Sequence, residues 1–294
     1  MKEFQWEKIG MIYEVNNNHP SLLSHASNPL ALHLSEDIYR IFYSGRDKDN
    51  RSAVSHVDYD IVRKQIVNDF KKPIVVPEYD TFYSHGITIG NHWQENGETY
   101  IGFMGWQQKD GEHWRGDIGK FNLTTREVSM LLGVNEEDSV SLSYPHIIHE
   151  NDIYKMWYGS TNSWSSVNGE MIHVIKYATS KDLKSWNFKG TCIPYVIGEA
   201  QAFSKPSVYK DQSGYHMWYS YRGGDGIPYR IGYGFSKTGE DWSTRQSNLT
   251  VSSAGWDDDM VCYPYVFKHK DQVYMVYNGN RYGLKGFGLA TAKV

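Results

Sequence analysis

The chain has 294 residues, a formal net charge of −4 and an aromatic content of 15%. This mild acidity argues against a nucleic-acid partner and against an anionic membrane surface, which both attract strongly basic proteins. No apolar run of about 18 residues is present, and residues 1–6 lack the apolar core of a secretion signal, so we expect a cytoplasmic protein without a membrane partner.

Five copies of one sequence unit follow one another along the chain. Each copy joins a first segment, which contains a proline in four of the copies, to an aromatic run such as residues 154–158, with turn residues in between. In chain order the copies cover 27–45, 84–105, 143–159, 204–220 and 262–279. Their anchors, which recur every 57 to 61 residues, are Pro29, Gly86, Pro145, Pro206 and Pro264. A near-constant period of this length predicts a ring of repeated units.

Both halves of each copy predict β-strands. The proline opens the first strand, where its missing N–H does least harm, and the aromatic run predicts the second. A further strand follows, clearest at 174–180 and 231–236, and leads to Trp186 and Trp242, which we expect to be packing residues. The last copy ends without this Trp and outer strand, whereas residues 4–12 supply both before the first copy. We therefore predict an all-β, five-bladed β-propeller of one domain, 1–294, whose N-terminal strand closes the last blade.

In such a ring, the residues before each anchor and the residues after each aromatic run should share one rim of the central channel. Polar, cationic and aromatic side chains are frequent in both sets. They suit a saccharide, including one that carries phosphate or carboxylate, because Arg binds anions through a bidentate fork and aromatic faces stack on sugar rings. The predicted substrate-binding residues are His25, Asn28, Arg46, Trp106, Tyr144, Lys205, Arg222, Tyr263 and Arg281.

The repeats, the proline before the first strand and the segment at 178–182 before Trp186 resemble those of the five-bladed β-propeller glycosidases. That group includes furanosidases, arabinanases, xylosidases, fructosyl-processing enzymes and the mannoside phosphorylases. The resemblance covers the whole chain. It implies a glycosyl hydrolase- or phosphorylase-like activity in carbohydrate metabolism, on an imported oligosaccharide or a polysaccharide-assembly intermediate.

The residues that carry catalysis in that group are substituted here. The Asp-Pro positions of the first and third blades hold Asn28 and Tyr144, and the general-acid position of the fourth blade holds Ser204. The mannoside phosphorylases share the Asn-Pro of the first blade, but their second-blade Asp aligns with His85. Three functions therefore stay open: an enzyme that cleaves or transfers a glycosyl unit, a non-catalytic sugar-binding propeller, and a scaffold whose funnel is only a packed channel.

Glycoside cleavage needs an acid that protonates the leaving oxygen, together with a base, a nucleophile or an incoming phosphate. If loops supply these groups, the predicted catalytic residues are Asp47, His85, Glu199 and Asp258, with Asp225, Asp257 and Asp259 as further candidates. A carboxylate in an aromatic funnel would have the raised pKa that an acid requires. Cys192 and Cys262 lack metal-type spacing, so we expect two free thiols, no metal and no cofactor.

Overall fold

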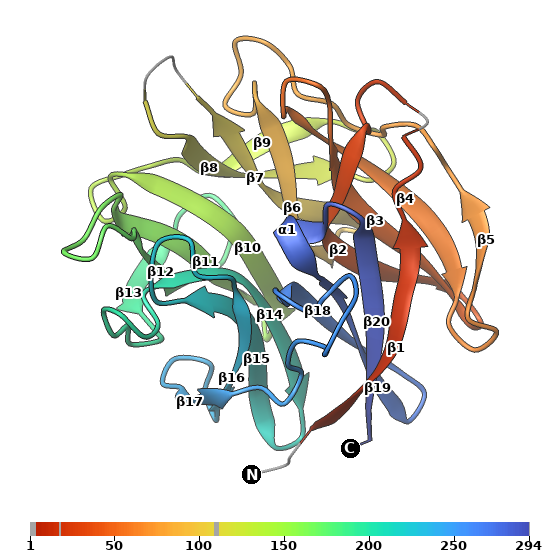
Figure 1. Cartoon of the computed structure of the whole chain (residues 1–294). Helices are drawn as coiled ribbons and strands as arrows, with labels where there is room; N and C mark the ends of the chain where they lie inside the picture. Colours follow the sequence, from red (N-terminus) through yellow and green to blue (C-terminus); the bar gives the residue numbers. More distant parts are fainter. Residues whose placement is uncertain (1–3, 18, 109–111, 294) are drawn as a thin grey trace.

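The computed structural model of the chain describes residues 4–17, 19–108 and 112–293. Its strands form four-stranded antiparallel blades around an axis (Figure 1). Blade 1 consists of β2 (Ser24–Ser35), β3 (Ile38–Arg46), β4 (Ser52–Asp60) and β5 (Gln65–Asp69). Blade 2 consists of β6 (Gly86–Glu95), β7 (Glu98–Gln107), β8 (Arg115–Asn122) and β9 (Val128–Leu132).

The same meander recurs in the second half of the chain. Blade 3 consists of β10 (Ser141–Glu150), β11 (Ile153–Ser163), β12 (Ile172–Ser180) and β13 (Asn187–Thr191). Blade 4 consists of β14 (Ala202–Asp211), β15 (Gly214–Arg222), β16 (Arg230–Ser236) and β17 (Ser243–Gln246). Blade 5 joins β18 (Cys262–His269), β19 (Gln272–Asn278), the short helix α1 (Asn280–Gly283) and β20 (Gly286–Lys293) to β1 (Gln5–Glu14).

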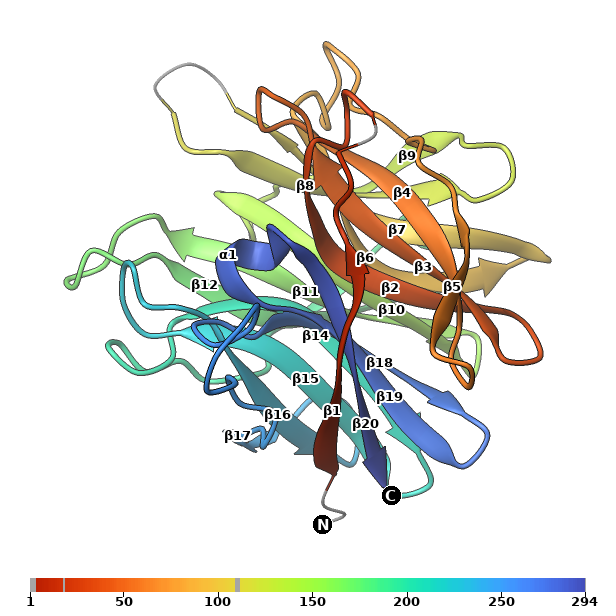
Figure 2. The same cartoon turned by 45° about the vertical axis from the view of Figure 1, so that its right-hand side comes forward.

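The N-terminal strand closes the ring. β1 pairs antiparallel with β20, from Gln5 opposite Lys293 to Glu14 opposite Gly286, so both chain ends lie at the same end of blade 5 (Figure 2). The innermost strands β2, β6, β10, β14 and β18 contact one another in that order, and β18 contacts β2. The predicted five-bladed, all-β propeller closed by the N-terminal strand is confirmed.

The blades are buried on both faces, which explains why the strands lack a regular apolar–polar alternation. All nine residues of β4 are buried. Trp157 and Trp218, from the aromatic runs of blades 3 and 4, are fully buried. Phe4 and Trp6 reach Trp218 with ring centroids 4.9 and 5.6 Å apart. Aromatic side chains of this size bury about 150–250 Å² each, so the closing strand is held by packing as well as by its ladder.

Cys192 and Cys262 are free thiols, as predicted. Burial raises the pKa of both thiols, so neither is an activated nucleophile. Within the described part of the chain, no helix has the length and apolar character needed to cross a membrane.

Candidate functional site

In four blades the residue before the proline has an unusual backbone. Asn28, Tyr144, Lys205 and Tyr263 have φ angles of 56°, 42°, 47° and 53°, in the left-handed region that costs a non-glycine residue about 1–3 kcal/mol. Each lies where the first strand shifts its register against the second. Bulges of this kind re-aim side chains, and here the four side chains meet around the axis.

Blade 2 makes its bulge with a glycine. The register between β6 and β7 shifts between Ile89 and His92, which gives Gly90 the position that Asn28 has in blade 1. A Cβ at Gly90 would lie 2.0 Å from the carbonyl oxygen of Pro145. Blade 2 therefore contributes only backbone to this level of the axis.

The prediction that anchored this copy on Gly86 was wrong, because the copy has no proline to mark its bulge. Gly86 opens β6 and forms a backbone bridge to Ser52, before the bulge begins. His85 consequently does not occupy the position of a second-blade catalytic group. Its ring lies beside Trp106, with centroids 5.9 Å apart, and its Nδ1 accepts the N–H of Gln108 at 3.1 Å.

The bulges form the floor of a cavity of about 290 Å³, which residues from all five blades line. This volume is at the lower end of the range for small-molecule pockets, about 300–1,000 Å³. Six of the nine predicted substrate-binding residues are among the lining residues: Asn28, Arg46, Trp106, Tyr144, Arg222 and Tyr263. The ring topology thus gathers residues that are far apart in the sequence into one pocket.

Asn28 gives the floor an unpaired polar group. Its backbone N–H donates to Asn278 Oδ1 at 2.8 Å, which fixes the bulge. Asn28 is 2% exposed, and its Oδ1 has no hydrogen-bond partner among the described residues. Because buried polar atoms are nearly always paired, this oxygen is available to accept a hydrogen bond from a molecule in the cavity.

Aromatic rings form much of the wall. Tyr144 and Tyr263 have centroids 5.8 Å apart, and Tyr263 stacks on Tyr282 of α1 at 6.2 Å. Burial raises the pKa of Tyr144 and of Tyr263, so both phenols stay protonated and can donate hydrogen bonds. On blade 2, Trp106 is held by a hydrogen bond from Nε1 to Ser52 Oγ at 3.2 Å. Flat faces with fixed donors suit a sugar ring.

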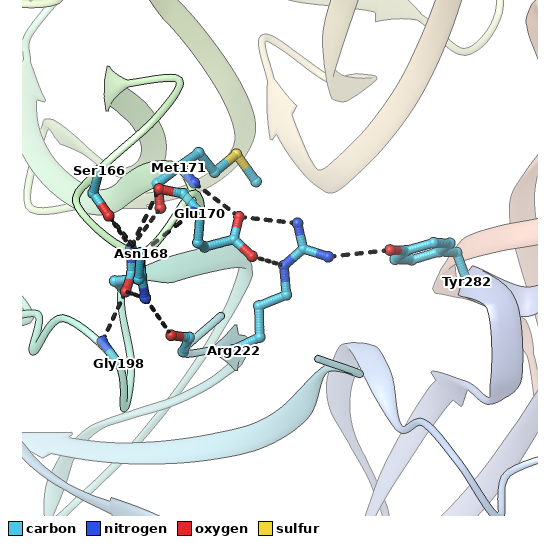
Figure 3. A network of polar contacts seen from close by, with 9 residues as sticks. Ser166, Asn168, Glu170, Met171, Gly198, Arg222 and Tyr282 are labelled. Carbon is cyan, nitrogen blue, oxygen red and sulfur yellow. Dashed lines mark hydrogen bonds and ion pairs between the residues drawn. The ribbon is translucent and has the colours of Figure 1, made fainter. Parts of the chain in front are cut away.

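Arg222 is held by a network that reaches across blades 3, 4 and 5 (Figure 3). Its Nε lies 2.8 Å from Glu170 Oε2, and its Nη2 donates to Oε1 at 3.1 Å. Its Nη1 donates to Tyr282 OH at 3.3 Å, and the guanidinium lies over the Tyr229 ring, 5.0 Å from the centroid. Glu170 is 2% exposed and accepts the N–H of Met171. The charge of Arg222 is therefore balanced by a carboxylate that does not line the cavity.

Side-chain amides fix the loop that carries Glu170 (Figure 3). Asn168 Nδ2 donates to Gln201 Oε1 at 2.8 Å and to the Gly223 carbonyl at 3.0 Å. Gln201 in turn donates to Ser166 Oγ at 2.9 Å and accepts the N–H of Gly198 at 2.8 Å. The blade 3 loop is thereby tied to blade 4, which holds Glu170 against Arg222.

Arg46 differs from Arg222 in having no partner. It ends β3 and lines the cavity, and its guanidinium forms no ion pair or hydrogen bond with the described residues. Burial, together with the charges of Arg46 and Arg281, lowers the pKa of His25 to about 4. The rim of blades 1 and 5 therefore carries two arginines beside a neutral histidine.

The cavity also contains lining residues that were not predicted: Met171, Trp114, His173, Tyr229 and Tyr282. Trp114, His173 and Tyr229 lie at the start of the third strand of their blades. In an antiparallel meander the third strand starts at the rim where the second ends, so this position repeats in every blade and could have been predicted. Tyr282 depends on a left-handed backbone in α1, with φ of 61°, which no pattern in the sequence indicates.

His173 is a neutral member of the cavity wall. Its Nε2 lies 2.7 Å from Ser143 Oγ, and its Nδ1 lies 2.7 Å from Thr161 Oγ1. Burial lowers its pKa to about 4. It therefore adds hydrogen-bonding capacity but no charge at neutral pH.

None of the four predicted catalytic residues lines the cavity. Asp47 closes a turn, where its Oδ1 accepts the N–H of Arg51 at 2.8 Å. Asp258 is exposed and accepts from Asn280 Nδ2 at 2.6 Å, and Glu199 is exposed on its loop. His85 directly precedes β6 beside Trp106, without lining the cavity. The structure does not bring these groups together as an acid and a base.

Three predicted binding residues also lie outside the cavity lining: His25, Lys205 and Arg281. His25 and Arg281 belong to the rim beside Arg46, whereas Lys205 is buried beneath the floor.

In the ranges 4–17, 19–108 and 112–293, no group of three or more His, Cys, Asp or Glu side chains is arranged to hold a metal ion.

No family model matches the chain. The uncharacterized proteins MT1551 and Rv1502, from two strains of Mycobacterium tuberculosis, are each 33% identical to it over 299 residues. The matched region covers 97% of this chain and 98% of each relative, so the likeness extends over the whole propeller.

Solved structures share the fold at low sequence identity. A glycoside hydrolase superposes with a TM-score of 0.75 at 14% identity, over 98% of this chain and 91% of its own. A member of the mannoside phosphorylase family, which contains glycoside hydrolases that target β-1,2-mannosidic linkages in Candida mannan, gives 0.69 at 13%, over 99% and 94%. A sucrose-6-phosphate hydrolase from Lactobacillus gasseri gives 0.66 at 14%, over 95% and 59%. The chain has the fold of the propeller glycoside hydrolases, as the resemblance implied.

Proposed function

The chain belongs to the same family as MT1551 and Rv1502 of Mycobacterium tuberculosis, and we propose that it is a carbohydrate-active protein that binds a saccharide in the axial cavity. The unpaired Oδ1 of buried Asn28 carries this proposal, because a sugar hydroxyl is a suitable donor for it. The aromatic faces of Trp106 and Tyr263 in the same cavity support it, as does the fold by analogy.

We further propose that the saccharide carries a negative charge, as phosphate or carboxylate. Arg46 lines the cavity without a counter-charge, and Arg281 lies at the same rim. A guanidinium binds either anion through two parallel hydrogen bonds. The described lining residues include no Asp or Glu that would repel such a group.

The geometry favours binding over hydrolysis by a pair of carboxylates. That mechanism requires two carboxyl groups about 5–10 Å apart on either side of the scissile bond. The described lining residues include no carboxylate, and Glu170 is already engaged by Arg222.

Phosphorolysis is the second candidate, and the unpaired Arg46 in the cavity lining is the observation that favours it. The incoming phosphate replaces the base or nucleophile, so the protein needs to supply only an acid. Glu170 is buried in contact with the lining residue Arg222, and Arg46 would bind the phosphate.

Binding is tested by calorimetric titration of the wild-type protein with neutral and anionic mono- and disaccharides. For a saccharide that binds, Asn28→Ala and Trp106→Ala should each weaken affinity about tenfold or more, since the lost contact is worth about 1–3 kcal/mol. Asn187→Ala, at an exposed asparagine outside the cavity, is the matched control. An equal loss in the control, or no binding across the panel, would overturn the proposal.

The enzymatic alternative is tested with the same panel by measuring sugar release with and without phosphate. Release that requires phosphate would establish phosphorolysis, and its loss in Glu170→Gln, with saccharide affinity and unfolding midpoint retained, would assign the acid to Glu170. Binding without release would leave the chain as a saccharide-binding propeller. Release that persists in Glu170→Gln would show that another group acts as the acid.

A further inference from the structure

Lys205 crosses the axis of the propeller beneath the cavity floor. It belongs to β14 in blade 4, and its residue exposure is 1%. Its Nζ donates to the carbonyl oxygens of Ile89 at 3.0 Å, Gly90 at 3.2 Å and Asn28 at 3.4 Å. These oxygens belong to the bulges of blades 1 and 2, which lie on the other side of the ring from blade 4.

The ammonium group has carbonyl oxygens as partners instead of a carboxylate. Lys176, by contrast, lies 2.7 Å from the buried carboxylate of Asp138, whereas no described carboxylate forms an ion pair with Lys205. Burial lowers the pKa of the Lys205 ammonium group to about 7, so the charged form is dominant only below that pH. A buried charge is costly unless it is paired or fully hydrogen-bonded. Three carbonyl oxygens match the three N–H donors of one ammonium group, and oxygen dipoles of this kind are also the ligands that hard cations prefer.

The position of Lys205 separates two hollows. Above it lies the axial cavity, to which its neighbours Ser204 and Asn28 contribute. Below it lies a second pocket of about 390 Å³, whose lining includes Asn91, His146 and Val208. The pKa of the His146 ring is lowered by burial and by the charge of Lys205, to about 3, so this ring adds no second charge at the axis.

We propose that the carbonyl oxygens of Asn28, Ile89 and Gly90 form a binding site for a primary ammonium ion, which the chain fills with its own Lys205 side chain. The bound ammonium ties blade 4 to blades 1 and 2 and closes the channel below the cavity. Lys205 is thus a positioning residue for the floor on which Asn28 lies, and not a contact for the anionic part of a ligand. The proposal does not depend on the identity of the saccharide.

The test removes the Lys205 side chain by mutation and supplies an ammonium ion from solution. Lys205→Ala should unfold at a lower temperature than wild type, and propylammonium chloride, which replaces the missing atoms beyond Cβ, should restore the midpoint in a saturable way. 1-Propanol fills the same space without charge, and tetramethylammonium supplies charge without N–H donors, so neither should restore it. The wild-type midpoint should respond equally to all three additives.

Three results would overturn the proposal. These are no rescue by propylammonium, equal rescue by 1-propanol, and equal rescue by tetramethylammonium. No rescue by propylammonium would show that the carbonyl oxygens do not bind an ammonium ion. Equal rescue by the alcohol would show that only the volume of the side chain matters, and equal rescue by tetramethylammonium would show that only its charge matters.

A second variant and the wild-type protein keep the proposal testable if Lys205→Ala does not fold. Lys205→Met retains most of the volume and removes the donors, so its midpoint should fall well below that of Lys184→Met, a change at an exposed lysine. In ¹⁵N-lysine-labelled wild-type protein at pH 6, the Lys205 ammonium should give an exchange-protected signal that is missing in Lys205→Met. Equal midpoints for the two Met variants, or the lack of a protected signal, would reject the ammonium site.

Discussion

Arg46 and Arg222 end the second strands of blades 1 and 4, and both line the axial cavity. Their surroundings differ in one respect. Arg222 is ion-paired with the buried Glu170 and lies over Tyr229, whereas Arg46 has no partner among the described residues. The repeat places both guanidinium groups at the same rim, but one belongs to the scaffold and the other is free to bind an anion.

The comparison shows that position within the repeat does not define the role of a charged residue. A buried ion pair holds its members in place, because removing one leaves an uncompensated charge. An unpaired guanidinium at a cavity wall keeps its five donors for a ligand or for water.

The largest effect is expected from Glu170→Ala. It leaves the half-buried Arg222 without its counter-charge, which should lower the free energy of unfolding by about 3–5 kcal/mol in urea denaturation. Asp49→Ala removes an exposed carboxylate that lies 3.8 Å from Lys48 and should cost less than about 1 kcal/mol. Similar losses in the two variants would show that the Arg222 network does not contribute to stability.

The free energy of unfolding should depend on pH through His173, which is neutral in the folded protein. Its folded pKa of about 4 lies below the unfolded value of 6.5, so the unfolded state binds more protons between these values. Stability present above pH 6.5 should therefore be lost as the pH falls to 4, by on the order of 3 kcal/mol from this residue.

The measurement is urea denaturation at pH 7, 5.5 and 4 for wild type, His173→Gln and His113→Gln. Burial also lowers the pKa of His25, His56, His92 and His146, so His173→Gln should reduce the pH dependence by the share of one group and not abolish it. The change at the exposed His113 should leave it unaltered. If the free energy of unfolding of His173→Gln depends on pH as steeply as that of wild type, other groups cause the acid sensitivity.

Arg46→Met tests the arginine that has no partner. Its free energy of unfolding should stay within about 0.5 kcal/mol of wild type, because no partner is lost. Phosphate should raise the unfolding midpoint of wild type above that in sodium chloride of equal ionic strength, and this difference should fall by at least half in Arg46→Met. Arg63→Met, at an exposed arginine outside the cavity, should retain the full phosphate effect; its loss there would point to general screening.

The smallest effect is expected from Asp258→Asn, a change at a predicted catalytic residue. Asp258 is exposed in a turn outside the cavity lining, so stability should change by less than about 1 kcal/mol and saccharide affinity by less than twofold. A loss of binding or turnover in this variant would restore the loop carboxylates as site residues.

Much of the fold and part of the site could be predicted before the structure. The prediction that Pro29, Pro145, Pro206 and Pro264 open the first strands was wrong, because these residues lie at bulges inside the strands. The expectation that the first two strands of a blade meet at one rim placed Asn28 and Arg46 near each other, and both line the cavity. The predicted anchor of the second copy was wrong because Gly90 is not followed by a proline, so no residue in the sequence marks the register of β6 against β7. Cavity residues at the start of the third strands were not predicted, because the sequence argument placed only the ends of the first two strands of each blade at the rim.

The five repeats, the strands and the use of residues 4–12 to complete the last blade can be predicted from the amino-acid sequence, because period, turn residues and aromatic runs are local signals. Which polar groups have partners depends on the folded arrangement of the blades. Glu170 neutralises Arg222 across 52 residues, and Lys205 reaches carbonyl groups more than 100 residues away. Such pairings depend on how the blades face one another around the axis, and no local pattern of residues encodes that arrangement.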